Sequence, residues 1–178
     1  MRTMLIGAVA AAFLAAAYAE QPEVLNQPAP ELVGGLWLNT PKSRPVPLAT
    51  RRGKVTVVHF WTFGCINCRH NLPIYARWHR QLAGKDVAII GVHTPETEPE
   101  RETINVTRAT QQLAVEYPVL IDDQGLNWSR WHQQYWPAVY LIDKQGRIRY
   151  RWVGEMNYGK TAGAAVMTRL IEELLDEH

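Results

Sequence analysis

Residues 55–73 have the sequence VTVVHFWTFGCINCRHNLP, and the order of residue types in this stretch decides the fold. The run 55–60 is rich in β-branched side chains, which predicts a buried strand. Residues 65–82 place apolar side chains along one face at helical spacing, which predicts an amphipathic helix. The two cysteines of the chain, Cys65 and Cys68, therefore fall where the strand gives way to the helix.

The rest of the chain predicts further alternation of strands and helices. Elsewhere apolar runs bounded by turn residues predict strands, and helical spacing predicts helices. The N-terminal segment is rich in Pro and Gly and is expected to hold only short strands. The predicted strands are residues 36–38, 46–48, 87–92, 119–121, 138–142 and 147–153, and the predicted helices are residues 99–114, 126–132 and 161–175.

This order of elements predicts an α/β fold with a mixed central sheet and helices on both faces. Strands separated by helices are expected to run parallel, whereas the tight turn at 143–146 predicts an antiparallel hairpin. A chain of 178 residues can bury one substantial core, so a single domain is expected.

The first residues have the pattern of a secretory signal. Arg2 gives a basic start, residues 4–17 are almost entirely apolar, and Ala17-Tyr18-Ala19 supplies small residues at a cleavage site. The apolar run is short for a membrane-spanning helix, which needs about 20 residues. We therefore expect residues 1–19 to be a signal peptide and residues 20–178 to be the mature domain, with a retained N-terminal anchor as the alternative.

The charge balance of the chain is close to neutral. It carries 19 basic and 17 acidic residues, so its formal net charge is +2. Removal of residues 1–19 would take away one basic residue, Arg2. Nucleic-acid binding needs a clustered basic face. We therefore expect no nucleic-acid partner.

Cys65 is expected at the start of a helix, where free backbone N–H groups and the positive end of the helix dipole stabilise a thiolate. Its pKa should therefore be lowered, which makes it the attacking thiol. Cys68 lies one turn further along the same side of the helix and can close a disulfide with Cys65. The pair predicts an enzyme that exchanges thiols and disulfides and needs no separate cofactor.

Other uses of the two cysteines have less support in the sequence. A structural disulfide across so small a loop removes little chain entropy from the unfolded state. Haem attachment requires His directly after the second cysteine, where Arg69 stands. A zinc site usually has four ligands, and histidines elsewhere in the chain would have to complete it. A carrier that binds copper or zinc through the two thiolates is the alternative function.

The motif around the cysteines resembles thioredoxin, and it is closer still to exported TlpA-like proteins and the thioredoxin-like domain of the DipZ type. The core of the resemblance is Phe60-Trp61-x-x-x-Cys65-x-x-Cys68 followed by Pro73. It implies a thioredoxin fold with a TlpA-like insertion and an N-terminal extension. Further matches are Gly53-Lys54-Val55, Gly91-Val92-His93-Thr94-Pro95-Glu96, Tyr135-Trp136-Pro137-Ala138 and Tyr140-Leu141-Ile142-Asp143.

The resemblance implies that the Trp136–Pro137 peptide bond is cis and lies beside the cysteines. A turn there would expose the backbone of Trp136 to an extended substrate segment, which could pair with it as an added strand. Trp61 and Trp136 would then frame the reactive sulfur, so Trp61, Trp136 and Pro137 are the candidate substrate-binding residues. The alternative is that both tryptophans are ordinary core aromatics.

Two further residues are candidates for proton transfer. In thioredoxin a buried Asp lies beneath the second cysteine, and His59 stands at that position here. His59 could take the proton of Cys68, or it could be a neutral packed side chain. In TlpA-like proteins an acid after the second strand approaches the cysteines, which makes Glu96 a candidate; the alternative is a surface residue.

The sequence therefore predicts an exported, periplasmic thiol–disulfide oxidoreductase, expected to be a monomer. The resemblance implies client proteins with thiols or disulfides and a membrane electron donor or acceptor that resets the pair. The resemblance to this family favours reduction of client disulfides. Ile66 and Asn67, the two residues between the cysteines, do not decide the direction of electron flow. A peroxide-reducing enzyme on the same fold is a further alternative, although the Pro- and Thr-rich loop around the attacking cysteine of such enzymes is absent around Cys65.

Overall fold

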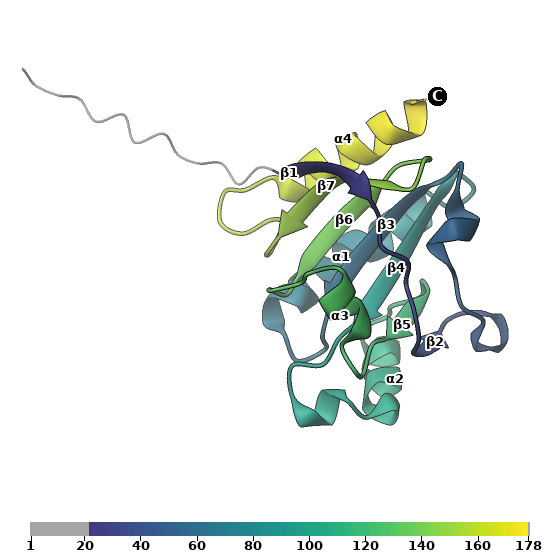
Figure 1. Cartoon of the computed structure of the whole chain (residues 1–178). Helices are drawn as coiled ribbons and strands as arrows, with labels where there is room; N and C mark the ends of the chain where they lie inside the picture. Colours follow the sequence, from purple (N-terminus) through teal and green to yellow (C-terminus); the bar gives the residue numbers. More distant parts are fainter. Residues whose placement is uncertain (1–21, 178) are drawn as a thin grey trace, which may run out of the picture.

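A computed structural model describes residues 22–177, which form a seven-stranded mixed sheet flanked by helices (Figure 1). The signal peptide predicted for residues 1–19 lies outside the described residues. The strands lie side by side in the order β1-β7-β6-β3-β4-β5-β2. Their bounds are Glu23–Pro28 (β1), Leu36–Leu38 (β2), Val55–Trp61 (β3), Val87–His93 (β4), Val119–Ile121 (β5), Ala138–Ile142 (β6) and Arg147–Val153 (β7).

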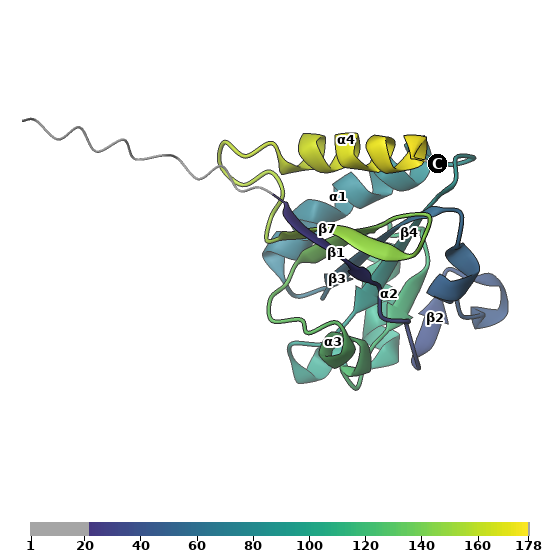
Figure 2. The same ribbon diagram turned by 45° about the horizontal axis from the view of Figure 1, so that its top comes forward.

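The helices cover both faces of the sheet, as expected from the sequence. Figure 2 shows α1 and α4 side by side over one face, with α3 on the opposite side. The bounds are Ile66–Gln81 (α1), Thr103–Gln112 (α2), Leu126–Arg130 (α3) and Gly163–Asp176 (α4), and the short 3₁₀ turns are Pro41–Ser43 (η1), Leu48–Arg51 (η2) and Glu98–Glu100 (η3).

The central strands pair as the order of elements predicts. β3 pairs in parallel with β4, and β4 pairs in parallel with β5. β6 forms an antiparallel hairpin with β7 and also pairs with the other side of β3. β3 is therefore a central strand, and its end delivers the chain to the cysteines at the start of α1.

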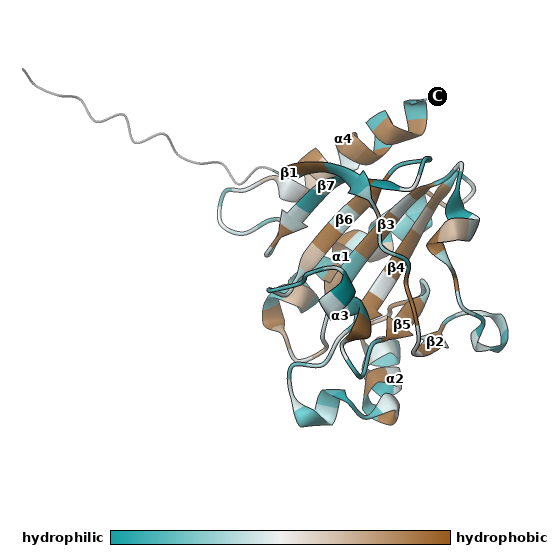
Figure 3. Cartoon of the chain, viewed as in Figure 1, coloured by the Kyte–Doolittle hydropathy of each residue, from teal (hydrophilic) through white to brown (hydrophobic). Residues whose placement is uncertain are grey.

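Two hydrophobic clusters form the core, one on each face of the sheet. Successive side chains of a strand point to opposite faces. Val57 and Trp61 of β3 accordingly pack with α1 and α4, whereas Val58 and Phe60 pack with the aromatic residues around α3. Figure 3 shows the hydrophobic residues running along β3, β4 and β6 at the centre of the sheet. His59 therefore points to the α1 side.

The N-terminal extension reaches both edges of the sheet. β1 pairs with β7 at one edge, and β2 pairs with β5 at the other. The strand predicted at 36–38 is confirmed, but the strand predicted at 46–48 is wrong, because Leu48 begins the turn η2 instead. Pro45 and Pro47 lack a backbone N–H and so cannot donate to a sheet. β1 was missed, because its only apolar pair, Val24 and Leu25, is too short a run to indicate a strand.

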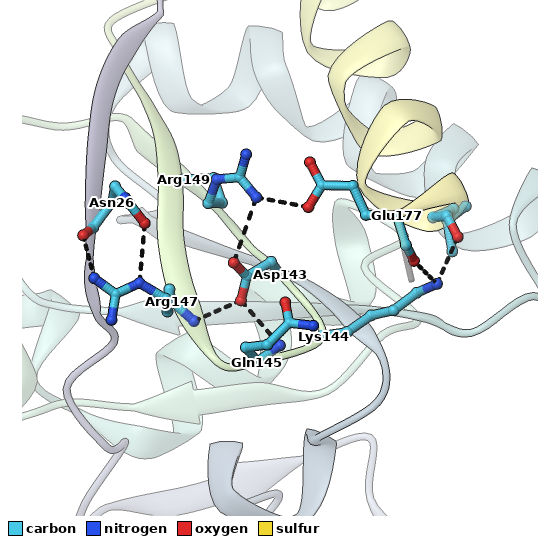
Figure 4. Close-up of polar contacts among 8 residues, drawn as sticks. Asn26, Asp143, Lys144, Gln145, Arg147, Arg149 and Glu177 are labelled. Atoms are coloured by element: carbon cyan, nitrogen blue, oxygen red, sulfur yellow. Dashed lines mark hydrogen bonds and ion pairs between the residues drawn. The ribbon is translucent and has the colours of Figure 1, made fainter.

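Polar contacts tie the β6–β7 turn to both ends of the described chain (Figure 4). Asp143 Oδ1 accepts the backbone N–H of Arg147 at 2.8 Å, which closes the turn. The Arg147 side chain donates to Asn26 Oδ1 of β1 at 2.9 Å. Lys144 Nζ donates to the Glu177 carbonyl after α4 at 2.6 Å. These contacts fix β7, whose following loop contacts the helix that carries the cysteines.

Candidate active site

Cys65 forms the N-cap of α1, so the helix begins one residue later than the sequence predicts. Its backbone is extended, with φ −75° and ψ 116°, and its sulfur accepts the backbone N–H of Cys68 at 3.3 Å. An N-cap residue takes up one of the free N–H groups at the start of a helix through its own side chain. Here the side chain that does so is the reactive sulfur.

The surroundings lower the pKa of the half-buried Cys65 thiol from its usual 9.0 to about 7. The largest cause is the hydrogen bond from the Cys68 thiol, and backbone N–H groups of Cys68 and Asn67 add to it. Burial and the negative charge of Glu96 act in the opposite direction. A thiol with this pKa is about half ionised near pH 7, and the shift has the direction expected for a cysteine at a helix start.

The pKa of the Cys68 thiol is shifted in the opposite direction. It is fully buried, and burial is the largest cause that raises the pKa of its thiol far above the usual value. Hydrogen bonding to Cys65 raises the pKa further. Both cysteines are free thiols in the structure. One half-buried thiolate beside one fully buried, protonated thiol is the asymmetry that a nucleophile and its resolving partner require.

Glu96 lies close enough to the cysteines for its charge to raise the pKa of both thiols. It is exposed and follows β4 in the loop before η3. The structure thus brings Glu96 to the cysteine pair, as the TlpA-like resemblance implies. Its charge opposes formation of a thiolate, so its presence costs Cys65 part of the acidity that the helix start provides.

Glu100 is a buried residue beside the cysteine loop that the sequence did not reveal. It is only 2% exposed, and its carboxylate accepts backbone N–H groups from Gly64 at 2.9 Å, Glu96 at 2.8 Å and Thr97 at 2.7 Å. Burial raises the pKa of Glu100, but hydrogen bonds from Thr62 and from these amides hold it below the usual value. The charged carboxylate therefore joins the loop before Cys65 to the loop that carries Glu96.

The close approach of Glu100 also requires Gly64 to be a glycine. A Cβ atom at position 64 would lie 2.5 Å from Glu100 Oε1, far inside van der Waals contact. Sequence reasoning missed Glu100 because it stands in an acidic stretch with Glu98 and Glu102, where one buried carboxylate gives no separate signal.

His93 supports the same loop from the end of β4. Its Nε2 accepts the backbone N–H of Phe63 at 3.3 Å, and the two rings stack with centroids 5.5 Å apart. Burial lowers the pKa of His93 to about 4, although the charge of Glu100 acts against this. The imidazole is therefore neutral at physiological pH, and it accepts a hydrogen bond rather than carrying charge.

His59 is fully buried beneath α1, where it stacks on Tyr75 with ring centroids 4.0 Å apart. Burial lowers the pKa of His59 to about 3, so the ring is neutral. Neither ring nitrogen has a hydrogen-bond partner within residues 22–177. A Cβ at Gly91 would lie 3.0 Å from His59 Nε2 and 3.1 Å from Trp61 Nε1, so a glycine in β4 makes room for both rings.

Tyr75 and Asn71 lie between Cys68 and the rest of the core. The pKa of Tyr75 is raised by burial first and by charge on Cys68 second, so its hydroxyl lies near that sulfur. Asn71 Nδ2 donates to the Gly154 carbonyl at 3.1 Å, and its Oδ1 accepts the Met156 N–H at 3.0 Å. Asn71 therefore holds α1 against the loop after β7.

The predicted substrate-binding residues divide into two kinds. The Trp136–Pro137 bond is cis, as the resemblance implies. Trp136 is half-buried, stacks on Trp128 at 3.9 Å between centroids, and borders a cavity of about 200 Å³ with Thr94 and Pro95. Trp61, in contrast, is fully buried in the core below the cysteines. Only Trp136 is therefore open to direct contact with a substrate.

Two structural features do not occur in the described part of the chain. Among residues 22–177, no group of three or more His, Cys, Asp or Glu side chains is arranged to hold a metal ion. Within the same range, none of the helices is long and apolar enough to cross a bilayer.

Comparison with known proteins identifies relatives of this chain. The model of the AhpC/TSA family matches residues 25–151. Protein DipZ of Mycobacterium tuberculosis is 37% identical over 150 residues, which cover 84% of this chain and 21% of DipZ. This chain therefore spans about a fifth of the length of DipZ. Thiol-disulfide oxidoreductase YkuV of Bacillus subtilis is 27% identical over 131 residues, covering 73% of this chain and 86% of YkuV.

Solved structures show the same fold. The crystal structure of a thiol-disulfide isomerase from Corynebacterium glutamicum superposes with a TM-score of 0.69 at 24% identity, over 84% of this chain and 98% of that one. This likeness confirms the thioredoxin-like fold predicted from the sequence.

Proposed function

Because the chain belongs to the AhpC/TSA family and is a thioredoxin-like protein of the TlpA/DipZ type, we propose that it exchanges electrons with the cysteines of client proteins. The observation that carries this proposal is the asymmetry of its own pair. Cys65 is half-buried with a thiol pKa of about 7, whereas Cys68 is fully buried and protonated.

In the reducing direction the Cys65 thiolate attacks one sulfur of a client disulfide. The client's second sulfur leaves as a thiolate, and a mixed disulfide joins the client to Cys65. The Cys68 thiol then loses its proton and attacks Cys65, which releases the client's first sulfur as a thiol. The client gains two electrons, and the pair becomes a disulfide that a separate dithiol donor must reduce.

Deprotonation of Cys68 is the step that needs a proton acceptor. We assign this role to His59 as part of the proposal, because it is neutral and its ring nitrogens, behind Tyr75, have no hydrogen-bond partner among residues 22–177. Its low pKa makes it a weak base, so it would hold the proton only briefly before passing it on. Glu96, which is exposed and close to both thiols, would exchange that proton with water.

The surface around Cys65 suits a protein client. Ile66 beside the nucleophile is 58% exposed, and Tyr135 beside Trp136 is 63% exposed. Exposed apolar side chains around a reactive group mark a surface that contacts a partner. A client strand would lie across Trp136, beside the buried Pro137, with its cysteine at Cys65. The reducing direction, export to the periplasm, a monomeric state and a membrane electron donor belong to the same proposal.

Trapping of clients tests the proposal directly. A Cys68→Ser protein keeps the nucleophile but cannot resolve the mixed disulfide, so it should accumulate covalent partners that a reductant releases. A Cys65→Ser protein is the matched control and should trap none. Equal yields from the two variants, or none from either, would contradict the proposal.

The two rival functions have their own readouts. A copper or zinc carrier would retain stoichiometric metal in native mass spectrometry, and Cys65→Ser would abolish the retention. A peroxidase would consume hydrogen peroxide in the presence of a thiol reductant. We expect neither result, because Cys68 is buried and protonated, and because no Pro- and Thr-rich loop surrounds Cys65.

A further inference from the structure

A second cleft lies far from the cysteines, along the first half of β4. Its volume is about 370 Å³, and its walls include Val87 to Ile90 of β4, the segment between β2 and β3, and His79 at the end of α1. Figure 1 shows that this segment lies on the side of β4 away from β3. His79 stands fourteen residues after Cys65, about 20 Å along the helix. The cleft is therefore separate from the cysteine site.

The floor of the cleft is an open strand edge. β4 pairs with β3 along its whole length, from Val87 to His93, but it pairs with β5 only from Gly91 onward. The backbone groups of the even-numbered residues of β4 point toward β3. The pattern starts at Asp86, directly before β4, whose carbonyl accepts the Val55 N–H at 2.8 Å. The odd-numbered residues face the other way, and the Gly91 N–H donates to Pro118 at 2.9 Å.

Pro118 explains why the pairing stops there. In the parallel ladder the next donor toward the Ile89 carbonyl would be the N–H of residue 118, and proline has none. Neither the N–H nor the carbonyl of Ile89 has a hydrogen-bond partner within residues 22–177. The outward carbonyl of Val87 is likewise free in this range. Ile89 is only 2% exposed, so these unpaired groups lie at the bottom of the cleft, where a strand that enters the cleft would pair with them.

The walls carry positive charge. Arg44 and Arg51 line the cleft, and its lining contains no acidic residue. Two buried polar atoms of the lining, Arg51 Nε and Thr40 Oγ1, have no partner among the described residues. The charge of Asp86 acts on Arg51, but the Asp86 carboxylate already pairs with Lys54 at 3.2 Å.

We propose that this cleft binds an extended peptide segment with a carboxylate side chain, which adds to β4 as a strand and pairs its carboxylate with Arg51. The four residues from Val87 to Ile90 span about 13 Å, which admits a segment of three or four residues. Apolar walls at Val46 and Pro118 would receive its neighbouring side chains. A bidentate carboxylate contact would satisfy the buried Arg51 Nε.

Short capped peptides provide the probe. We would titrate the ¹⁵N-labelled full chain with acetyl-Thr-Val-Glu-Val-Thr-amide and follow the backbone amide resonances. The shifts should be saturable and centred on Ile89. A peptide with Gln in place of Glu should bind about tenfold more weakly, as loss of one charge-assisted contact implies. A peptide with an N-methyl group on the central residue should lose most of its affinity, because it cannot pair as a strand.

Variants of the protein distinguish binding in the cleft from non-specific binding of the peptide. Arg51→Gln should weaken the Glu peptide about tenfold and leave the Gln peptide unchanged. Arg44→Gln, at an exposed position, tests the charge of the rim if Arg51→Gln folds poorly. Arg108→Gln, an exposed change on α2, is the matched control and should have no effect.

Three results would overturn the inference: no saturable shift at Ile89, equal binding of the N-methylated peptide, or shifts that arise from self-association of the chain. None of these depends on the cysteines. The same titration with a Cys65→Ser, Cys68→Ser protein should give unchanged affinity, so the cleft and the exchange activity can fail separately.

Discussion

Replacement of Glu100 by Gln tests how the loop before the nucleophile is held. The carboxylate receives three backbone N–H groups at 2.7 to 2.9 Å while almost fully buried. Gln keeps one oxygen, which can still accept the amides of Glu96 and Thr97. Its NH₂ group would then face the N–H of Gly64, donor against donor. The substitution therefore removes the charge and leaves one buried amide unsatisfied.

These losses set the expected size of the effect. An unsatisfied buried donor costs about 1–3 kcal/mol, and the lost charge weakens the two remaining hydrogen bonds. We expect Glu100→Gln to lower the free energy of unfolding by about 2–4 kcal/mol at pH 7. Glu98→Gln is the control, because Glu98 is 85% exposed in its ion pair with Arg101 and should change stability by less than about 1 kcal/mol.

The difference in unfolding free energy between wild type and Glu100→Gln should depend on pH in a predictable direction. The folded-state pKa of Glu100 is below its usual value, so the stabilisation is fully present above the usual carboxyl pKa of about 4.3 and is lost as the pH falls through the folded pKa. The gap between wild type and Glu100→Gln should thus be constant above pH 6 and shrink below pH 4. Urea denaturation gives the free energies.

The same variant should also react more slowly. Gly64 directly precedes Cys65, so release of its N–H loosens the N-cap that lowers the thiol pKa. We expect the midpoint of Cys65 alkylation to move upward from pH 7, whereas Glu98→Gln should keep it. If Glu100→Gln unfolds at the wild-type urea concentration and alkylates with the wild-type pH profile, the positioning role is refuted.

Two other predictions concern proton transfer at the pair. Glu96→Gln removes a charge that raises the pKa of the Cys65 thiol, so the midpoint of Cys65 alkylation should fall by about 0.3–0.5 of a pKa unit. This shift should diminish in 1 M salt, which screens the charge. A midpoint that stays or rises would contradict the placement of the Glu96 carboxylate near Cys65. His59→Ala should slow resolution of a preformed mixed disulfide at neutral pH more than Val57→Ala, which opens a cavity on the same face of β3; equal rates in both variants from pH 5 to 8 would leave His59 as a packed neutral ring.

Much of the fold could be predicted from local patterns. Strands β3 to β6 follow from apolar runs, and β7 follows from the turn at 143–146 that pairs it with β6, because these signals act within a few residues. β1 could not be predicted, since its polar side chains are stabilised by pairing with β7, more than one hundred residues away. The strand expected at 46–48 failed because the prolines around it outweigh its apolar residues.

The residues of the candidate site could likewise be predicted only in part. Cys65 and Cys68 could be identified because the chemistry depends on their spacing and on the start of a helix. Glu100 and Asn71 could not, because their roles come from burial and from backbone groups that the fold brings to them. The open edge of β4 also emerges only in three dimensions, although Pro118, which causes it, is visible in the sequence.

The pH dependence of thiol alkylation in the reduced wild-type protein tests the central claim most directly. Iodoacetamide should modify Cys65 with a midpoint near pH 7, and mass spectrometry should find Cys68 unmodified up to pH 9, because its thiol is buried and protonated. A Cys65 midpoint of 8.5 or above, or equal modification of the two cysteines at pH 7, would contradict the assignment of Cys65 as nucleophile and Cys68 as its resolving partner.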